Sequence, residues 1–341
     1  MLADTTLKRG TEVALNDLAS LHGWYPVAID CEANPTVPTV WWRYLGQRRL
    51  TAAFFEDSFV GLPEADRRVC RTPLSALDTL ADTLAGTVAP SAFVFHVSRC
   101  GSTLLTQMLA TLPHCIVASE PPVLDAFFRL HHHHPQHSGG AQTLRQLVAA
   151  LGQRRSACET HFVVKLDSWH MPWLPWLRSV FPQTPCVVLY RDPAQVLASH
   201  GRQRGAHMVP GLADLSRLKV DVSGLEPGDL DGYAARVLSS VFQAALVAVD
   251  GGANTGRPLT LLNYTQLPEV LWTRLLAQWA VPCSLSEMTA IQMRARFNAK
   301  RPQAVFLGDA QPMVQALAET HGLHPALADY IALEQWRLKA S

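Results

Sequence analysis

The sequence predicts a doubly wound α/β fold with a mainly parallel sheet and an N-terminal α+β appendage. Short β-branched runs alternate with segments of helical periodicity from about residue 92 onward, which is typical of right-handed β-α-β units. The first 90 residues instead combine a Val-, Trp- and Tyr-rich run with helical patterns. We therefore expect an appendage or cap at 1–90 and the main domain at 91–341.

The composition indicates a globular protein. The chain has 341 residues, of which 48% are hydrophobic and 17% charged, and a formal net charge of +1. This charge gives no global basic field for nucleic acid. The seven cysteines form no C-x-x-C pair, which argues against disulfides and zinc. We find neither a signal-peptide pattern nor a run of about 18 apolar residues, and we expect a cytoplasmic protein without a membrane partner.

Each element follows from a local pattern. In the first 90 residues, the run around Gly46 predicts a short hairpin and 73–86 a helical segment. Four apolar runs predict buried parallel strands at 93–97, 161–166, 186–190 and 259–264. Helical periodicity predicts helices at 102–112, 141–151 and 232–249. Ligands of such a sheet bind at the carboxyl ends of its strands.

The first predicted anion site lies where the strand at 93–97 ends, in the stretch "SRCGST". The following helix has its N-terminus there, so backbone N–H groups and the helix dipole converge on the loop. Gly101 permits close approach of the backbone, Arg99 adds charge, and Ser102 and Thr103 add hydroxyls. A Walker A loop would need a Gly-Lys pair, which is missing. The alternative is an ordinary strand–turn–helix connection with a surface arginine.

A second predicted anion site follows the strand at 186–190. Arg191 stands at the carboxyl end of that strand, and Asp192 and Pro193 predict the start of a helix. Ser199 lies two turns into this helix, where it and Arg191 could bracket one phosphate. The alternative is a helix start with a surface arginine and a serine that faces its own helix. Together, the two sites suit a nucleotide with a phosphate at each end.

The two motifs, "SRCGSTLL" and "YRDPAQVLASH", resemble those of the sulfotransferases that use 3′-phosphoadenosine 5′-phosphosulfate (PAPS). The first is similar to that family's 5′-phosphosulfate loop, and the second to its 3′-phosphate motif. The resemblance runs from about residue 92 to about 305 and implies a P-loop fold of the sulfotransferase type. Two residues depart from the family pattern: Ser98 replaces a proline and Cys100 a serine or threonine.

The resemblance implies a set of donor-binding residues along the chain. Tyr264 looks like the tyrosine that follows a late strand in the family, and Lys300 and Arg301 belong to a late basic stretch. A solvated basic loop is the alternative for that stretch. The implied PAPS-binding residues are Ser98, Arg99, Cys100, Gly101, Ser102, Thr103, Arg191, Ser199, Tyr264, Lys300 and Arg301.

The resemblance also implies catalytic roles. Arg99 would neutralise charge on the leaving oxygens, and Lys165 would polarise the transferring group or form a structural ion pair. Three residues compete as the base that takes the acceptor's proton. We rank Glu120 first, His170 second and Asp167 third. The structural alternatives are a capped loop carboxylate for Glu120 and a packed core histidine for His170.

The function that the resemblance implies is transfer of a sulfuryl group from PAPS to a hydroxyl or amine of a small-molecule or peptidic acceptor. The alternatives are a P-loop small-molecule kinase that uses ATP and a nucleotide-binding module without turnover. We expect no metal, and we interpret His131–His134 as part of a mobile loop within 121–140. The aromatic residues of the first 90 could cap the acceptor crevice or form the face of a homodimer.

Overall fold

The computed structural model describes residues 6–14, 21–31, 36–80, 86–251, 259–300, 304 and 323–339. These residues form two compact units. The first unit comprises Met1–Ser91, Thr106–Leu166 and Cys283–Arg294, and the second comprises Ala92–Leu105, Asp167–Pro282 and Ala295–Ser341.

A four-stranded sheet forms the N-terminal part of the first unit. Its strands are β1 (Thr11–Glu12), β2 (Trp24–Asp30), β3 (Thr39–Tyr44) and β4 (Arg68–Pro73), in the order β1-β4-β3-β2. β3 is antiparallel to both β2 and β4, and β1 is parallel to β4. Trp24, Trp42 and Phe55 are buried, so these aromatic side chains contribute to the core of the unit.

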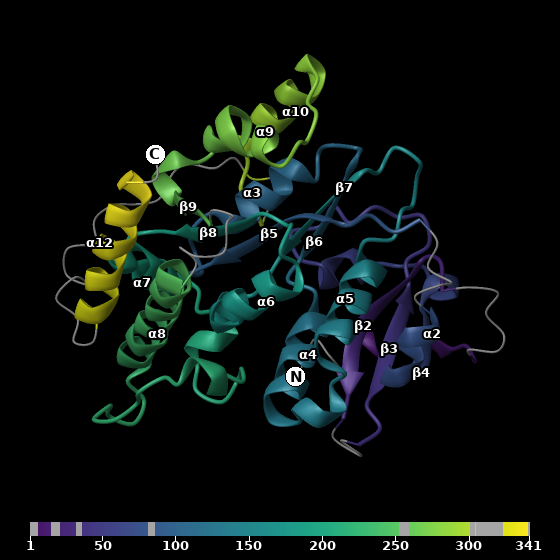
Figure 1. The fold of residues 1–341 in the computed structure, drawn as a ribbon, viewed down its shortest axis with the longest axis horizontal. Helices are drawn as coiled ribbons and strands as arrows, with labels where there is room; N and C mark the ends of the chain where they lie inside the picture. Colours follow the sequence, from purple (N-terminus) through teal and green to yellow (C-terminus); the bar gives the residue numbers. More distant parts are fainter. Residues whose placement is uncertain are drawn as a thin grey trace. The chain divides into compact units, whose positions relative to one another are not determined.

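The other described elements of the first unit include several helices and a pair of parallel strands. Helices α4 (Pro122–His133) and α5 (Gly140–Leu151) pack against β2, and α2 (Leu77–Leu80) packs against α5 (Figure 1). The strands β6 (Cys115–Ser119) and β7 (His161–Lys165) are parallel, with Ser119 opposite Lys165. Their carboxyl ends therefore lie side by side.

Three parallel strands form the centre of the second unit: β5 (Pro90–His96), β8 (Cys186–Tyr190) and β9 (Thr260–Asn263). The strand order of the whole mainly parallel sheet is β6-β7-β5-β8-β9. Alternation of its strands with helices confirms the predicted α/β class, with a separate mixed sheet in the N-terminal part. The strands predicted at 161–166, 186–190 and 259–264 are found within one residue of those limits at each end.

Helices follow each strand of the second unit. The helix α3 (Ser102–Leu109) begins after β5 and runs on into the first unit, and α7 (Pro193–Arg202) begins after β8. The helices α8 (Leu230–Asp250) and α12 (His324–Lys339) pack side by side (Figure 1). The remaining elements include the 3-10 segment η7 (Ser168–Trp173), α6 (Leu174–Val180), the 3-10 turn η11 (Tyr264–Gln266), the short α9 (Leu276–Gln278) and α10 (Leu285–Ala295).

One helix, α8, is long and apolar enough to cross a membrane by length and composition alone, with a mean hydropathy of 1.4 over its most apolar window. Half of that window is buried inside the protein. Core helices of soluble proteins have the same properties, so α8 is weak evidence for a membrane span.

Three local predictions were wrong. The run around Gly46 forms no hairpin, because β3 pairs with β2 before it and with β4 after it. The segment 121–140 is not a loop, since α4 includes His131–His133 and buries Phe127, Phe128 and Leu130. The helix that begins at Ser102 ends at Leu109, before Pro113.

Candidate functional site

The loop at 98–101 between β5 and α3, here called the nest, has positive φ angles of the kind found in anion-binding turns. Three of its residues have left-handed φ angles: Ser98 (74°), Arg99 (47°) and Gly101 (87°). Such turns bring successive backbone N–H groups to one side of the chain. The helix α3 begins immediately afterwards, with Ser102 4% and Thr103 8% exposed. The N-terminus of α3, with the positive end of its helix dipole, therefore adjoins the nest.

The side chains of this loop point in different directions. The thiol of Cys100 is fully buried and donates to the carbonyl of Leu189 in β8, at 3.2 Å. Arg99 is only partly buried, and its guanidinium donates to the carbonyl of Gln203. The side chain of Cys100 is therefore turned to the sheet.

Gly101 approaches the turn after β9 so closely that a side chain at this position would have to displace its neighbours. A Cβ atom there would lie 2.6 Å from Cδ1 of Leu267 and 2.9 Å from Cδ2 of Tyr264. Both distances are far below ordinary van der Waals contact. The glycine is thus required by its surroundings as well as by its φ angle.

We expect Gly101→Ala to lower the free energy of unfolding by more than the 1–2 kcal/mol or so that a left-handed alanine costs. The added methyl group must displace Leu267 or Tyr264 in addition. Urea denaturation measures the loss. The matched control is Gly211→Ala, because Gly211 has φ +78° and open space around its Cβ position. An equal loss of unfolding free energy in the two variants would show that the close contacts of Gly101 do not affect stability.

The second predicted anion motif lies against the first. Arg191 is 7% exposed, and its guanidinium is 4.1 Å from the ring centroid of Tyr264. It donates to the carbonyl of Arg99 at 3.4 Å and to the side chain of Gln195 at 2.8 Å. The structure thus brings together Arg191, Tyr264 and the 98–103 loop.

The helix α7 begins as its sequence predicts. The carboxylate of Asp192 accepts hydrogen bonds from the N–H groups of Ala194 and Gln195, and Pro193 occupies the first turn. Ser199 lies two turns further on and is partly buried. Ser199 therefore lies on the helix that follows Arg191, and a shared phosphate contact of the two residues stays a prediction.

Sequence reasoning missed a group of histidines beside the loop. His200 is 1% exposed and its Nε2 lies 3.0 Å from Oγ of Ser98. The ring of His207 packs edge-on against it, with centroids 5.4 Å apart. On the other side, Nδ1 of His96 accepts from the N–H of Ser98 at 3.0 Å. His200 directly follows Ser199 in the sequence, but its contact with Ser98 spans 102 positions and has no local signal.

The surroundings of His200 are cationic. Burial and, to a smaller extent, repulsion by His207, Arg99, Arg204 and Lys300 together lower the pKa of His200 to about 2. The loop therefore lies in a local positive potential, although the net charge of the chain is only +1. Lys300 belongs to the described residues, whereas Arg301, the other basic residue predicted to bind the donor, lies outside them.

The predicted residues of the first unit form a buried ion pair. Lys165 is 1% exposed, and its ammonium group donates to the carboxylate of Glu120, whose side chain is 20% exposed. Lys165 also lies 5.3 Å from the ring centroid of Phe54. Glu120 has a left-handed φ of 55°, and its N–H donates to the carbonyl of Lys165 at 2.8 Å. The strand ends of β6 and β7 thus hold this carboxylate in one place.

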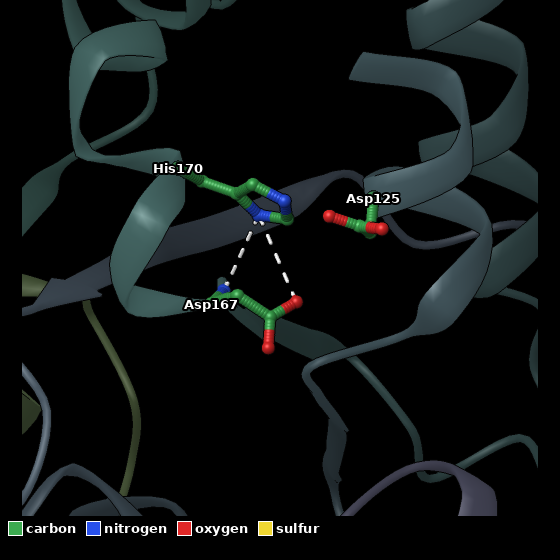
Figure 2. A group of neighbouring side chains, drawn as sticks. All are labelled: Asp125, Asp167 and His170. Atoms are coloured by element: carbon green, nitrogen blue, oxygen red, sulfur yellow. Dashed lines mark hydrogen bonds and ion pairs between the residues drawn. The ribbon is translucent and has the colours of Figure 1, made fainter. Parts of the chain in front are cut away.

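His170 and Asp167 belong to the second unit and contact each other (Figure 2). The Nδ1 atom of His170 accepts from the N–H of Asp167 at 3.3 Å and lies 3.8 Å from its carboxylate. His170 is 2% exposed and packs edge-on against Trp169. These contacts give both residues a structural role at the start of η7.

No family model and no curated protein matches the chain. Among solved structures, it is similar to sulfotransferase STF1 from Mycobacterium tuberculosis H37Rv, with 15% identity, a TM-score of 0.44, and coverage of 72% of this chain and 80% of that chain. Sulfotransferase STF9 from Mycobacterium avium is 14% identical, with a TM-score of 0.44 and coverage of 76% and 80%. The sulfotransferase domain from the curacin biosynthetic pathway is 16% identical, with a TM-score of 0.40 and coverage of 68% and 97%. The fold of this chain is the α/β fold with a mainly parallel sheet and a separate N-terminal mixed sheet.

Proposed function

We propose that this protein is a PAPS-dependent sulfotransferase that acts on a hydroxyl or amine of a small-molecule or peptidic acceptor. The observation that carries the proposal is the contact of Arg191 with both the backbone of Arg99 and the ring of Tyr264. These contacts bring two predicted anion motifs together that lie far apart in the sequence, which supports a single site. A ligand with two separate phosphate groups fits such a site better than a nucleoside triphosphate does.

In this proposal, different residues of the second unit bind different parts of the donor. The nest at 98–101 and the first turn of α3 would hold the 5′-phosphosulfate, with Arg99 beside it. Arg191 and Ser199 would hold the 3′-phosphate, and Tyr264 would help to place the nucleoside. The proximity of Lys300 to His200 supports a further contact with donor phosphate.

The residues of the first unit supply the proton chemistry in this proposal. Glu120 would take the proton of the acceptor, and Lys165 would hold the carboxylate in place through their ion pair. PAPS supplies the sulfuryl group, whose bond to the 5′-phosphate oxygen breaks as a bond to the acceptor forms. Arg99 would stabilise the charge that develops on the leaving oxygens.

The first test is binding of 3′-phosphoadenosine 5′-phosphate, without magnesium. A ligand at 100 times its Kd stabilises the folded state by about 2.7 kcal/mol, so we expect a clear rise in Tm with this nucleotide and a smaller one with ATP. A larger magnesium-dependent rise with ATP would favour a kinase instead. No rise with the bisphosphate would contradict the proposal.

The same assay locates the 3′-phosphate. Arg191→Ala and Ser199→Ala should weaken binding of the bisphosphate, because each removes a contact worth roughly 1–3 kcal/mol. Binding of adenosine 5′-phosphosulfate, which lacks the 3′-phosphate, should change little. Because Arg191 also contacts Arg99 and Gln195, each shift is measured against the unliganded Tm of the same variant. Equal weakening for both nucleotides would show that these residues only hold the helix.

A further inference from the structure

Ser98 stands where the sulfotransferase motif has a proline, and the backbone of Ser98 has a conformation that proline cannot adopt. Its φ angle is 74°, whereas a proline ring fixes φ near −65°. Proline therefore could not occupy this position without a change of the loop. Ser98 is 6% exposed, so its hydroxyl group is held inside the site and must have a defined set of partners.

The partner of this hydroxyl is His200, and the hydrogen-bond pattern defines the direction of donation. The N–H of Gly205 donates to Nδ1 of His200 at 3.3 Å. A backbone N–H can only donate, so Nδ1 carries no hydrogen and the neutral ring carries it on Nε2. That atom lies 3.0 Å from Oγ of Ser98. His200 therefore donates to Ser98, and Ser98 accepts.

The surroundings of the ring hold it in place and keep it neutral. His207 packs against it edge-on and in turn lies 3.3 Å from the hydroxyl of Ser168. Burial and the neighbouring cations lower the pKa of His200 to about 2, so the ring stays neutral at physiological pH. The direction of the hydrogen bond is thus constant over the working range of an enzyme.

The hydrogen of the Ser98 hydroxyl is consequently left for another acceptor. The N–H of Ser98 is already used, because it donates to Nδ1 of His96. Within the described part of the chain, the structure shows no acceptor for the O–H of Ser98. A buried donor without an acceptor is costly, and this one lies in the first residue of the anion nest.

We propose that His200 is a positioning residue that turns the Ser98 hydroxyl, as a hydrogen-bond donor, towards an oxyanion at the 5′ end of the bound nucleotide. This inference rests on the proposed function and adds a contact to it. In this chain, a serine oriented by a buried histidine would add a further donor to those already assigned to the loop, which are backbone N–H groups, Arg99 and the hydroxyls of Ser102 and Thr103.

The test is a double-mutant cycle in which isothermal titration calorimetry measures the Kd of 3′-phosphoadenosine 5′-phosphate. Ser98→Ala and His200→Leu should each weaken binding by about 10-fold or more, as expected for a hydrogen bond to a charged group. The double variant should bind no more weakly than either single variant, since both changes remove the same donor. His200→Gln should keep most of the affinity, because its amide N–H can replace the donor at Nε2.

Two controls separate this inference from its alternatives. Adenosine 3′-phosphate lacks the 5′ group, so its affinity should be the same in wild type and Ser98→Ala. If the wild type does not bind the bisphosphate, the proposed function itself fails. If the wild type binds it but Ser98→Ala binds equally well, or if the two single losses add in the double variant, only the present inference is overturned. If His200→Leu does not fold, the affinities of Ser98→Ala for the bisphosphate and for adenosine 3′-phosphate still test whether the Ser98 hydroxyl contacts the 5′ group.

Discussion

Replacing Glu120 with glutamine is expected to lower turnover by about 100-fold or more, with little change in donor binding. Glutamine keeps the shape and much of the hydrogen bonding of the side chain but cannot take a proton. The residues assigned to the donor lie in the second unit of the chain, whereas Glu120 lies in the first. Steady-state turnover and the Kd of the bisphosphate, measured on the same preparation, separate the two effects.

The ion pair with Lys165 complicates this experiment and requires its own control. Loss of the Glu120 charge leaves an ammonium group that is 1% exposed without its counter-ion, and breaking a buried pair in this way costs about 3–5 kcal/mol. Glu159→Gln is a matched control, because Glu159 and Arg155 form a second buried pair in the same unit, with both side chains 2% exposed. This variant should lose stability and keep turnover per folded molecule. An equal loss of turnover in both variants would reduce Glu120 to a structural role.

The other two candidate bases are compared in the same assay. His170→Asn and Asp167→Asn should lower turnover less than Glu120→Gln, since the two residues contact each other at the start of η7. Their main effect should be on the local packing of that segment. If His170→Asn abolished turnover while Glu120→Gln remained active, His170 would replace Glu120 as the base.

The parts of the fold that were predicted correctly are those with a strong local signal. The strand 186–190 is a continuous β-branched and apolar run, and all five of its residues are buried. The start of α7 follows from an N-cap aspartate and a proline in the first turn. The helix α4 was missed because Pro135, Gly139 and Gly140 were interpreted as marks of a loop that includes the histidine run. Pro122 in the first turn is typical of a helix start, and the spacing of Phe127, Phe128 and Leu130 fits a buried helical face.

The parts that the sequence could not predict depend on contacts between distant residues. The partner of β3 after Gly46 is β4, which begins more than twenty residues later, and no local turn pattern indicates that pairing. The residues proposed to bind the donor follow local motifs, but the contact of His200 with Ser98 spans 102 positions of the sequence. Hydrogen-bond partners at such separations require the folded chain.

Arg99→Ala is expected to reduce turnover by about 10²–10³-fold, the range typical of losing one group that stabilises transition-state charge. Its effect on stability should be small. The guanidinium is only partly buried, and its hydrogen bond to the carbonyl of Gln203 is of a kind that contributes about 0.5–1.5 kcal/mol. Arg99 has a left-handed φ of 47°, but alanine carries the same Cβ and the same backbone cost, so the strain of the loop is unchanged.

Two matched variants show whether the effect belongs to the position, the charge or the shape of the side chain. Arg99→Lys keeps the charge but loses the planar fork of donors, so it should recover part of the turnover if charge dominates and little if geometry does. Arg236→Ala removes an arginine from α8 that pairs with the exposed Asp221, and it should leave turnover within a few-fold of wild type. A transition-state role and a structural role predict different results. If Arg99 stabilises the transition state, Arg99→Ala should lower turnover far more than it lowers the bisphosphate affinity or the Tm. A variant that melts early but keeps its activity per folded molecule would assign Arg99 to the stability of the loop.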